Sequence, residues 1–347
     1  MKKVRFGIVG AGNIADVHTK SLAAASNAEP VVVYDTVRER AAALAARHGI
    51  RAAGTLEELL AADIEAVTIA TPSGLHSEAA VAAAKAGKHI LCEKPLEVTV
   101  EKADRILRAC EAGGVLLATV FQMRFTAAAQ RMKRTVEEGR FGVPVFANAA
   151  VHWFRPKSYY AQATWRGTWA LDGGGALMNQ GIHTVDLLLH FAGAVAEVDA
   201  RAMRRVHEAI EVEDTVAALI RFRSGAFGSL QASTACAPGF PVRIELLGTA
   251  GSAVMEDDRI VRWQFAEERP EDEEIRRQGA AGEGLASGSS NPTAIQAEGH
   301  RRQIEELAAA IRTGAKLSAT GVEGRRAVEL VCAVYEAARS GKTVLLS

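Results

Sequence analysis

The sequence has no surplus of charge of either sign: lysine plus arginine and aspartate plus glutamate number 41 each in 347 residues. Proteins that bind nucleic acids or acidic membranes electrostatically carry a basic surplus. No apolar run approaches the roughly 20 residues that a transmembrane helix needs. The apolar run after the N-terminal lysines ends in glycine, without a signal-cleavage pattern. We therefore expect a cytoplasmic protein that binds neither nucleic acid nor membrane.

Cysteine is scarce as well. Cys92, Cys110, Cys236 and Cys332 lie singly, without the Cys-x-x-Cys spacing of zinc sites or the density of a disulfide framework. The histidines and carboxylates show no His-x-x-x-His or carboxylate-dense spacing. These absences predict reduced thiols and no metal site.

A chain of 347 residues is long enough for two domains of ordinary size. In residues 1–122, short apolar runs alternate with Ala-rich stretches whose apolar positions recur three and four apart. We expect strands at 5–9, 29–34, 66–70, 89–92 and 115–120, and helices at 15–25, 38–48, 56–61, 76–86 and 100–112. This alternation predicts an α/β Rossmann domain with a doubly wound parallel sheet.

The pattern changes after residue 122. An amphipathic helix at 127–138 leads into longer β-like runs at 143–154, 195–206, 214–222, 226–235 and 242–248, with hairpin-like turns between some of them. Residues 266–299 are rich in Glu, Arg, Gly and Ser and suggest a long surface loop or partly mobile lid. Helices are expected at 301–312 and 321–340. Residues 123–347 are thus predicted to form an α+β domain with a mostly antiparallel sheet.

The strongest motif is G-A-G-N-I-A at Gly10–Ala15, directly after the first predicted strand. Gly10 permits a tight turn, and Gly12 lets a pyrophosphate approach the N–H groups of a helix N-terminus. The small Ala15 allows close packing of the helix on the strand. A glycine turn alone is common, but here strand, turn and helix agree. The segment predicts a dinucleotide site that includes Gly10, Gly12, Asn13 and Ile14.

Asp35 ends the second predicted strand, twenty residues beyond Ala15. An acid at this position accepts hydrogen bonds from the ribose hydroxyls of the adenosine half and repels a 2′-phosphate, which favours NAD over NADP. Arg38 lies three residues further on and offsets part of that repulsion. NADP therefore stays open as a second cofactor.

Two further segments follow predicted strands: Thr71–His76 and Cys92–Pro95. Loops at the carboxyl ends of parallel strands line the cofactor crevice, so we expect cofactor contacts from Thr71, Pro72, His76, Glu93 and Lys94. A lysine at a strand end is usually only a solvated charge. Beside a nicotinamide, its ammonium stabilises a developing alkoxide or relays a proton.

These segments and the run G-G-G-A-L-M-N-Q-G-I-H-T-V-D at Gly173–Asp186 resemble the glucose-fructose oxidoreductase, inositol dehydrogenase and rhizopine-catabolism family (Gfo/Idh/MocA). The resemblance covers essentially the whole chain. It implies a Rossmann domain followed by an α+β domain with a large open sheet, often used to form a homodimer or homotetramer. It also implies NAD(P)-dependent hydride transfer involving a carbinol or ketone of a sugar, sugar acid, nucleotide sugar or inositol.

The resemblance gives catalytic roles to two residues. Lys94 matches the active-site lysine of the family, and His183 matches the histidine in the helix after the glycine run. Gln122 joins the cofactor-binding positions. On its own, His183 would be an ordinary half-buried helix histidine. Because an unperturbed histidine has a pKa of about 6.5, we expect His183 to act as the general base and Lys94 to orient the hydroxyl. The sequence does not rank the two.

Asn179, His183 and Asp186 are spaced so that they share one face of an α-helix. Many members of the family have an aspartate at the position of Asn179, as a partner for the histidine. The amide here removes an Asp–His relay and suits a substrate hydroxyl or a ring nitrogen instead. The Met-Asn-Gln version resembles members that act on UDP-N-acetylglucosamine-derived uronates, which favours a nucleotide sugar or a sugar 3-hydroxyl.

Aromatic and basic residues of the second domain suit a polyol, because sugars bind to planar stacking surfaces and forked donors. We expect Arg124, Trp165 and Arg166 to line a substrate crevice between the domains. A second set fits the crevice and the core equally well: Trp153, Tyr159 and Tyr160.

Two alternative functions stay open. A catalytically silent NAD(P)-binding sensor of the same fold would need no proton-relay pair, so Lys94 and His183 argue against it. A dehydrogenase of a non-sugar, such as a dihydrodiol, would differ in the polarity of its substrate pocket. Trp165, Arg166 and Asn179 are more suited to a polyol.

Overall fold

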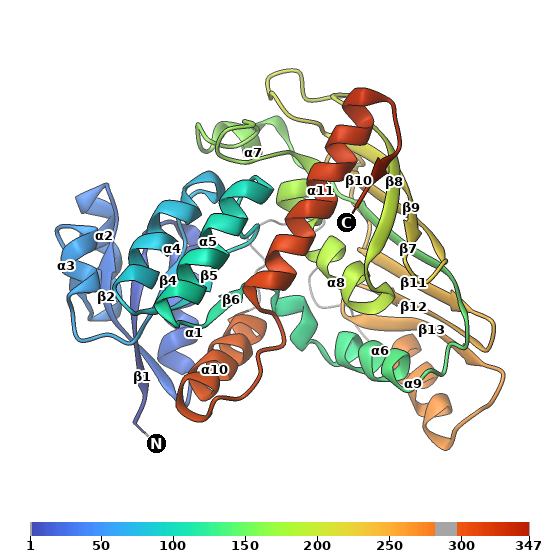
Figure 1. Cartoon of the computed structure of the whole chain (residues 1–347), viewed down its shortest axis with the longest axis horizontal. Helices are drawn as coiled ribbons and strands as arrows, with labels where there is room; N and C mark the ends of the chain where they lie inside the picture. The colour runs from blue at the N-terminus through green and yellow to red at the C-terminus, as the bar shows by residue number, and fades with distance from the viewer. Residues whose placement is uncertain (1, 282–296, 347) are drawn as a thin grey trace. The chain divides into compact units, whose positions relative to one another are not determined.

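The computed structural model describes residues 2–281 and 297–346, and the chain packs as two compact units (Figure 1). Among these residues, unit 1 contains 2–122 and 297–328, and unit 2 contains 123–281 and 329–346. The predicted second domain, 123–347, is therefore interrupted by a return of the chain to unit 1. The reason is hydrophobic: Ile304, Leu307 and Ala308 are buried in the core of unit 1. Within the described ranges, no helix is long and apolar enough to cross a membrane.

Unit 1 is built on a six-stranded parallel sheet of order β3-β2-β1-β4-β5-β6. Its strands are β1 (Val4–Val9), β2 (Ala28–Tyr34), β3 (Arg51–Ala52), β4 (Ala66–Ile69), β5 (His89–Cys92) and β6 (Leu117–Thr119). The strand order reverses between β1 and β4, and ligands of such sheets bind outside the carboxyl ends of the strands at this point. The prediction of a doubly wound parallel sheet is confirmed.

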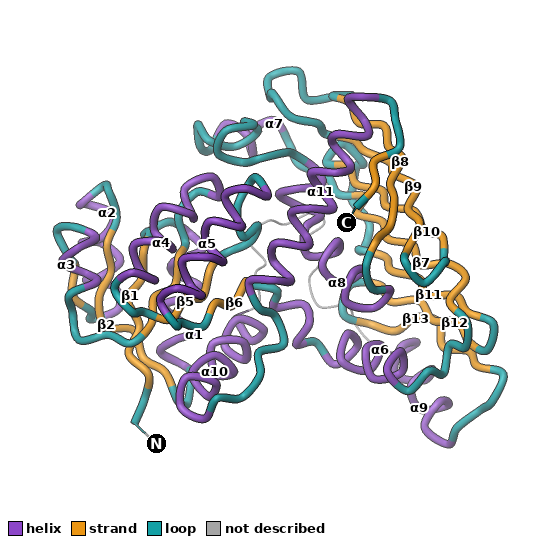
Figure 2. The backbone as a smooth tube through the Cα atoms, viewed as in Figure 1, coloured by secondary structure: helices purple, strands orange, loops and turns teal. Residues whose placement is uncertain are grey.

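Helices cover both faces of this sheet (Figure 2). One face is covered by α1 (Asn13–Ala24), α2 (Arg38–His48) and α10 (Ala297–Thr313), and the other by α3 (Leu56–Leu60), α4 (His76–Lys85) and α5 (Val100–Gly113). All four residues of β4 are buried, which explains why its sequence is apolar without alternation. Small residues such as Ala80 and Ala83 let α4 pack closely on the strands.

Unit 2 contains an eight-stranded sheet of order β13-β12-β11-β7-β10-β9-β8-β14, in which only β7 and β10 pair in parallel among the described strands. Its strands are β7 (Pro144–His152), β8 (Val195–Met203), β9 (Thr215–Phe222), β10 (Phe227–Ser233), β11 (Arg243–Gly248), β12 (Gly251–Glu256), β13 (Arg259–Phe265) and β14 (Val344–Leu345). The prediction of a large, mostly antiparallel sheet is confirmed.

One face of this sheet packs on α8 (Ile182–Ala192) and α6 (Ala127–Glu137). Strand β9 shows the resulting alternation: Val216, Ala218, Ile220 and Phe222 are buried, whereas Leu219 between them is 67% exposed. Period-two burial of this kind fixes the register of the strand. The last helix, α11 (Gly321–Ser340), begins in unit 1 and ends in unit 2.

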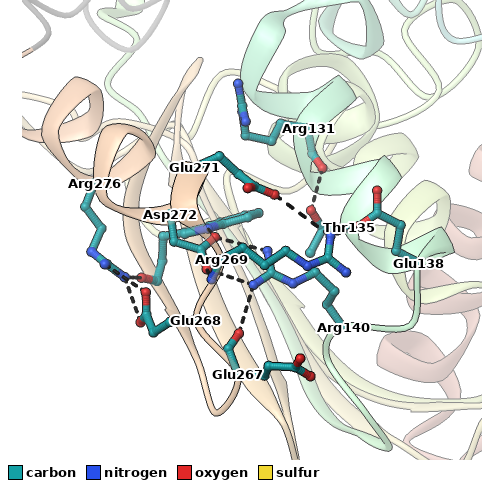
Figure 3. Close-up of polar contacts among 11 residues, drawn as sticks. Arg131, Thr135, Glu138, Arg140, Glu267, Glu268, Arg269, Glu271, Asp272 and Arg276 are labelled. Carbon is teal, nitrogen blue, oxygen red and sulfur yellow. Dashed lines mark hydrogen bonds and ion pairs between the residues drawn. The ribbon is translucent and has the colours of Figure 1, made fainter.

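The segment predicted as a long loop, 266–299, contains a helix instead, α9 (Pro270–Ala281). Pro270 stands at the first helical position and acids fill the first turn, both favourable at a helix N-terminus. Asp272 is buried and accepts hydrogen bonds from the Arg269 N–H at 2.8 Å and from Arg140 at 2.8 and 3.0 Å (Figure 3). The charge that suggested a loop therefore anchors a helix. The rest of the predicted loop, up to residue 296, lies outside the described residues.

Candidate active site

The glycine turn of unit 1 has the shape that a dinucleotide requires. Gly10 has a φ of +100°, and a Cβ added there would lie 2.6 Å from the Ala70 carbonyl oxygen, so only glycine fits. A Cβ added to Gly12 would meet no atom within 4 Å. Gly12 is the N-cap of α1, whose first turn has no side-chain cap. Asn13 is exposed and Ile14 is partly exposed at this helix N-terminus, where backbone N–H groups without a partner in the helix fit a pyrophosphate.

Asp35 ties this turn to the end of β2. Its Oδ2 accepts the Ala11 N–H at 2.7 Å and its Oδ1 accepts the Val37 N–H at 2.8 Å. Each carboxylate oxygen accepts more than one hydrogen bond, so the side chain keeps acceptor capacity for ribose hydroxyls. Arg38 begins α2 and is exposed, three residues from Asp35. The donor and acceptor set at this edge fits a dinucleotide.

His76 lies behind the cofactor edge. Its side chain is fully buried, with Nδ1 2.9 Å from the Pro95 carbonyl oxygen and Nε2 3.1 Å from that of Thr71. The ring therefore joins the loops after β4 and β5. Thr71 and Pro72 are partly exposed at the strand end, as expected of cofactor-lining residues. The geometry favours an indirect role for His76, through the two loops it holds, over the direct contact we predicted.

Glu93 is also buried, at the end of β5. Its Oε1 lies 2.7 Å from His18 Nε2 and 3.9 Å from His300 Nε2, and its Oε2 accepts the Lys94 N–H at 3.0 Å. The hydrogen bond and charge of His18, with the charges of His300 and Lys94, outweigh burial and lower the pKa of Glu93 to about 2. An ionised Glu93 thus fixes the backbone of Lys94, whose side chain is partly exposed.

His18, Glu93 and His300 are the one trio in residues 2–281 and 297–346 whose ligand atoms lie together within 4.8 Å, as metal ligands do. Two ligands of one tetrahedral zinc ion lie about 3.3 Å apart, given metal–ligand distances of about 2.0–2.1 Å. The 2.7 Å between His18 and Glu93 is a hydrogen-bond length instead. Thr68 Oγ1 completes the cluster, 2.7 Å from His18 Nδ1. The geometry favours a buried hydrogen-bond network.

In unit 2, the helix after the glycine run is not the single α-helix we predicted. Residues Ala176–Gly181 form a π-helix and α8 begins only at Ile182. Asn179 lies in the π-helix and His183 in α8, and both are partly exposed. The i, i+4 spacing of an α-helix therefore does not apply across this junction. Short π-helical turns are frequent at functional sites.

Glu213 caps the start of this π-helix. Its Oε2 accepts the Gly175 N–H at 2.9 Å, its backbone oxygen the Ala176 N–H at 3.1 Å, and its Oε1 the Leu177 N–H at 2.9 Å. The Tyr335 hydroxyl accepts the next N–H, that of Met178, at 3.2 Å. Four consecutive amides that have no partner within the helix are thus satisfied by two residues distant in sequence.

The glycine run is required by this cap. A Cβ on Gly175 would lie 1.8 Å from the Glu213 carbonyl oxygen, and a Cβ on Gly174 would lie 2.2 Å from the Tyr335 hydroxyl. Gly173 has a φ of +73°, in the left-handed region that favours glycine. The three glycines therefore bring the backbone against Glu213 and Tyr335, and so set the start of the π-helix.

Asn179 belongs to a polar network of unit 2. Its Nδ2 donates to Asp172 Oδ1, and its Oδ1 accepts from Gln180 Nε2. Gln180 Nε2 also lies 2.9 Å from the Tyr159 hydroxyl, and Gln180 Oε1 accepts from Arg155 at 2.8 and 3.1 Å. These contacts fix the orientation of the Asn179 amide. Asp172 thus supplies a carboxylate directly beside the Asn179 amide.

The aromatic and basic residues we predicted gather around Tyr159. The guanidinium of Arg166 lies 4.1 Å from the centre of the Tyr159 ring, and that of Arg155 lies 5.5 Å from it. Trp165 is half-buried, 5.6 Å from the Arg166 guanidinium. Tyr159 is buried and carries a cation–π contact, which makes it a support for Arg166. Trp165 and Arg166 remain partly accessible and stay candidates for substrate contacts.

Arg124 is placed differently from our expectation. It is 6% exposed, and its Nε and Nη2 donate to the two oxygens of Asp186 at 2.7 and 2.5 Å. This bidentate pair joins the turn before α6 to α8. A guanidinium held this way favours a structural role over the substrate contact we predicted. Gln122, the last residue of the first part of unit 1, is partly exposed.

Sequence reasoning missed several residues of both units. The missed residues are His18, His300, Asp172, Gln180, Glu213 and Tyr335. Four of them gain their roles from partners far along the chain: 75 residues separate His18 from Glu93, and 122 separate Glu213 from Tyr335. No local pattern encodes such pairs. Asp172 and Gln180 instead contact Asn179, which lies seven residues and one residue away. The one local signal is the Gln180 of the Met-Asn-Gln run.

Comparison with known proteins supports the interpretation of unit 1 as an NAD-binding domain and of unit 2 as its partner domain in an oxidoreductase. Residues 4–121 match the model of an oxidoreductase family with an NAD-binding Rossmann fold, and residues 129–254 match the GFO/IDH/MocA C-terminal domain. A crystal structure of the WlbA dehydrogenase from Bordetella pertussis with NADH and UDP-GlcNAcA is 34% identical, with a TM-score of 0.90 over 100% of this chain and 98% of that chain.

Two curated relatives are also oxidoreductases of sugar-like compounds. The 1,5-anhydro-D-fructose reductase of Ensifer adhaerens is 35% identical over 64% of this chain and 66% of its own length. The inositol 2-dehydrogenase of Rhizobium meliloti is 27% identical over 99% of both chains. With both of its domains matched, the chain belongs to the Gfo/Idh/MocA family of NAD-binding oxidoreductases.

Proposed function

We propose that this enzyme oxidises a secondary hydroxyl of a sugar, or reduces the matching ketone, with a nucleotide-linked N-acetylamino uronate as the first substrate to test. The observation that carries the proposal is the 34% identity over the whole chain to a dehydrogenase solved with NADH and UDP-GlcNAcA. The Asp172–Asn179–Gln180 network supports it, because fixed amide and carboxylate groups bind sugar hydroxyls.

NAD is the proposed cofactor, held at Gly10, Gly12, Asn13 and Ile14, with Asp35 on the adenosine ribose. Thr71, Pro72, Lys94 and Gln122 are proposed to complete the set, with Glu93 and His76 acting through the loops that they hold. The space around Gly12 and the acceptor capacity of Asp35 support this assignment. Arg38 is the one residue of the set that favours a 2′-phosphate, so NADP use would depend on it.

The proposal gives the proton work to Lys94 and His183. A nicotinamide held at the glycine turn would supply the hydride acceptor for oxidation of the carbinol. Lys94 donates a hydrogen bond to the substrate oxygen and stabilises the developing alkoxide, and His183 takes the hydroxyl proton. In the reverse direction, His183 returns that proton to the carbonyl oxygen. Asn179, Trp165 and Arg166 are proposed to bind the sugar.

Self-association through the open face of the unit 2 sheet is also proposed, as a homodimer or homotetramer. Phe146 and Phe227 are paired neighbours on β7 and β10 and are 43% and 57% exposed, and Leu219 on β9 is 67% exposed. Exposed apolar side chains clustered on a sheet commonly mark an interface. Light scattering of the wild-type protein and of Phe227→Asp tests this, since a wild-type monomer contradicts it.

The experiment that tests the function has two steps. Fluorescence titration with NADH and NADPH gives the affinity for each dinucleotide, with sub-millimolar NADH binding expected. An absorbance screen at the nicotinamide band then covers UDP-activated uronates, free sugars, inositols and a dihydrodiol. Turnover on one sugar class supports the proposal. Turnover on the dihydrodiol alone would contradict the substrate assignment, and tight NADH binding without any turnover would favour a sensor.

A further inference from the structure

We propose that Glu213 is a positioning residue for the proton chemistry of unit 2, acting with Tyr335 through the glycine run and the π-helix Ala176–Gly181. The proposal rests on the function proposed above, which gives Asn179 and His183 their roles. Glu213 acts through the backbone: it holds the amides of Gly175, Ala176 and Leu177, which start the segment that carries Asn179 and leads to His183.

The ionised form of Glu213 can accept all of its hydrogen bonds at once. Its two carboxylate oxygens accept from three donors, the N–H groups of Gly175 and Leu177 and the Tyr335 hydroxyl, each at 2.9 Å. A carboxylic acid carries a donor of its own on one of these oxygens. A proton on Oε2 faces the Gly175 N–H, and a proton on Oε1 faces the Leu177 N–H and the Tyr335 hydroxyl. Protonation therefore weakens at least one of the bonds that fix the π-helix.

Burial favours the opposite state. It raises the pKa of Glu213 to about 7, against the lowering by the hydrogen bonds from Leu177, Gly175 and Tyr335. Both states are therefore populated near neutral pH. Glu213 and Tyr335 help to line a hollow of about 200 Å³ in unit 2. The other titratable or charged groups around this carboxyl and Tyr335 are Tyr160, Arg204, Glu211, Cys332 and Arg339.

The glycine run transmits a change in the protonation of Glu213 to the π-helix, because its backbone packs directly against Glu213 and Tyr335. The missing Cβ atoms of Gly174 and Gly175 bring the backbone against Tyr335 and Glu213, so a rearrangement of that pair moves the backbone directly. We expect the segment to be held in its active geometry when Glu213 is ionised and to relax when Glu213 is protonated. Turnover should therefore fall as the pH drops through about 7.

The test is an amide titration of the isotope-labelled full chain, without substrate. In the wild type, we expect the amide signals of Gly175, Ala176 and Leu177 to shift together with one midpoint near pH 7. In Glu213→Gln this titration should be absent. In Tyr335→Phe it should remain but move to higher pH, because the carboxylate has lost a donor that stabilises its charge. Glu211→Gln, at an exposed carboxylate two residues away, should titrate like the wild type.

Steady-state kinetics on the best sugar supplies the second readout. Glu213→Gln should lower kcat about 10- to 100-fold, as expected for a misplaced catalytic segment, and leave the KM for NAD unchanged. Glu211→Gln should keep both constants. Because His183 as a base gives a pH limb of its own, the amide titration identifies Glu213 as the titrating group.

The outcomes separate the two proposals. A wild-type protein whose three amides do not titrate together overturns the role of Glu213 whatever the turnover, as does a folded Glu213→Gln with wild-type kcat. If no sugar is turned over but the amides titrate and Glu213→Gln abolishes the shift, the proposed function fails while the control of the backbone by Glu213 stands. If Glu213→Gln does not fold, the midpoint of the amide titration in Tyr335→Phe is the deciding measurement. A midpoint above that of the wild type supports the role of Glu213, and an unchanged midpoint overturns it.

Discussion

The Tyr335 hydroxyl lies 2.9 Å from Oε1 of Glu213, and the two side chains together hold the backbone amides that open the π-helix of unit 2. Burial raises the pKa of Tyr335 well above its usual range, so this hydroxyl keeps its proton near neutral pH and donates to the ionised carboxylate. The carboxyl of Glu213 is the partner that changes charge near neutral pH. The pair therefore joins a pH-dependent group to a fixed donor.

The first prediction concerns stability against pH. Glu213 has a pKa of about 7 in the folded state and an ordinary value of 4.5, so the folded state holds its proton more tightly than the unfolded chain does. Its contribution to the free energy of unfolding is fully present below pH 4.5. That contribution is lost as the pH rises to about 7, by about 3 kcal/mol in total. Urea unfolding of the wild type and of Glu213→Gln between pH 5 and pH 8 should show this loss in the wild type only.

The informative quantity is the difference between the two proteins, because other groups titrate over the same range. A difference in free energy of unfolding that stays constant from pH 5 to pH 8 would contradict a raised pKa. Glu211→Gln is the matched control, with the same change of charge at an exposed site, and should track the wild type.

The second prediction contrasts two glycines. Gly175→Ala places a Cβ 1.8 Å from the Glu213 carbonyl oxygen, so we expect the unfolding free energy to fall by at least about 3 kcal/mol. Gly12→Ala meets no atom within 4 Å and should cost less than about 1 kcal/mol. Its Cβ instead occupies the space proposed for the pyrophosphate, so NADH affinity should fall about tenfold or more. Equal effects of both substitutions on stability would refute this distinction.

The sequence predicts the parts of the fold that follow from local periodicity. Helix α2 and strand β5 begin and end where their patterns predict. Helix α2 ends at Gly49, which adopts the left-handed conformation of a helix C-cap, and β5 is a short apolar run that is buried from Ile90 on. Helix α9 was missed because its charged residues suggest solvent, whereas Asp272 is buried against Arg140. Membership of α10 in unit 1 depends on packing between segments about 280 residues apart, such as Ser26 and Glu305. No local pattern encodes that packing.

In the candidate site, too, some residues follow from local sequence patterns and others only from contacts between distant segments. Gly10, Gly12 and Asp35 are predictable because a strand, a turn and a helix together impose their spacing. The residues that hold the surrounding segments are not, because His18 and His300 reach Glu93, and Glu213 reaches the π-helix, from distant elements. The prediction of one regular α-helix through Asn179 and His183 was wrong, since residues Ala176–Gly181 form a π-helix with a different number of residues per turn. Only the folded backbone reveals that.

The third prediction separates a structural from a substrate role for Arg124. Its bidentate pair with Asp186 is nearly fully buried, and removing one partner leaves an uncompensated charge. Arg124→Met should therefore lower the free energy of unfolding by about 3–5 kcal/mol, and adding Asp186→Leu should recover part of the loss. Thermal and urea unfolding measure both. If Arg124→Met has wild-type stability but a raised KM for the sugar, Arg124 contacts the substrate and its structural role is wrong.

The fourth prediction concerns Lys94 and His183, the residues proposed to stabilise the developing alkoxide and to take the substrate proton, respectively. Lys94→Met and His183→Asn should each lower kcat by about 10²- to 10⁴-fold, because each removes a group that acts on the substrate oxygen. His183→Asn should leave NADH affinity unchanged, since it leaves the cofactor-binding loops of unit 1 intact. Lys94→Met also removes an expected cofactor contact, so its kcat is measured at saturating NAD. Single-turnover absorbance at the nicotinamide band measures the chemical step. Two surface residues serve as controls, Lys85→Met and His152→Asn, and should retain wild-type rates. Wild-type turnover in both Lys94→Met and His183→Asn would disprove the assignment while leaving the fold intact.

The fifth prediction concerns the choice of dinucleotide. Asp35→Ser removes the negative charge that repels a 2′-phosphate but keeps a hydroxyl acceptor for the Ala11 N–H. We expect the ratio of NADPH to NADH affinity to rise about tenfold or more, with most of the change on the NADPH side. Arg38→Ala, at the exposed start of α2, should weaken NADPH binding and leave NADH binding unchanged. Fluorescence titration with both dinucleotides measures the ratio. If Asp35→Ser weakens both equally, Asp35 acts mainly by holding the glycine turn.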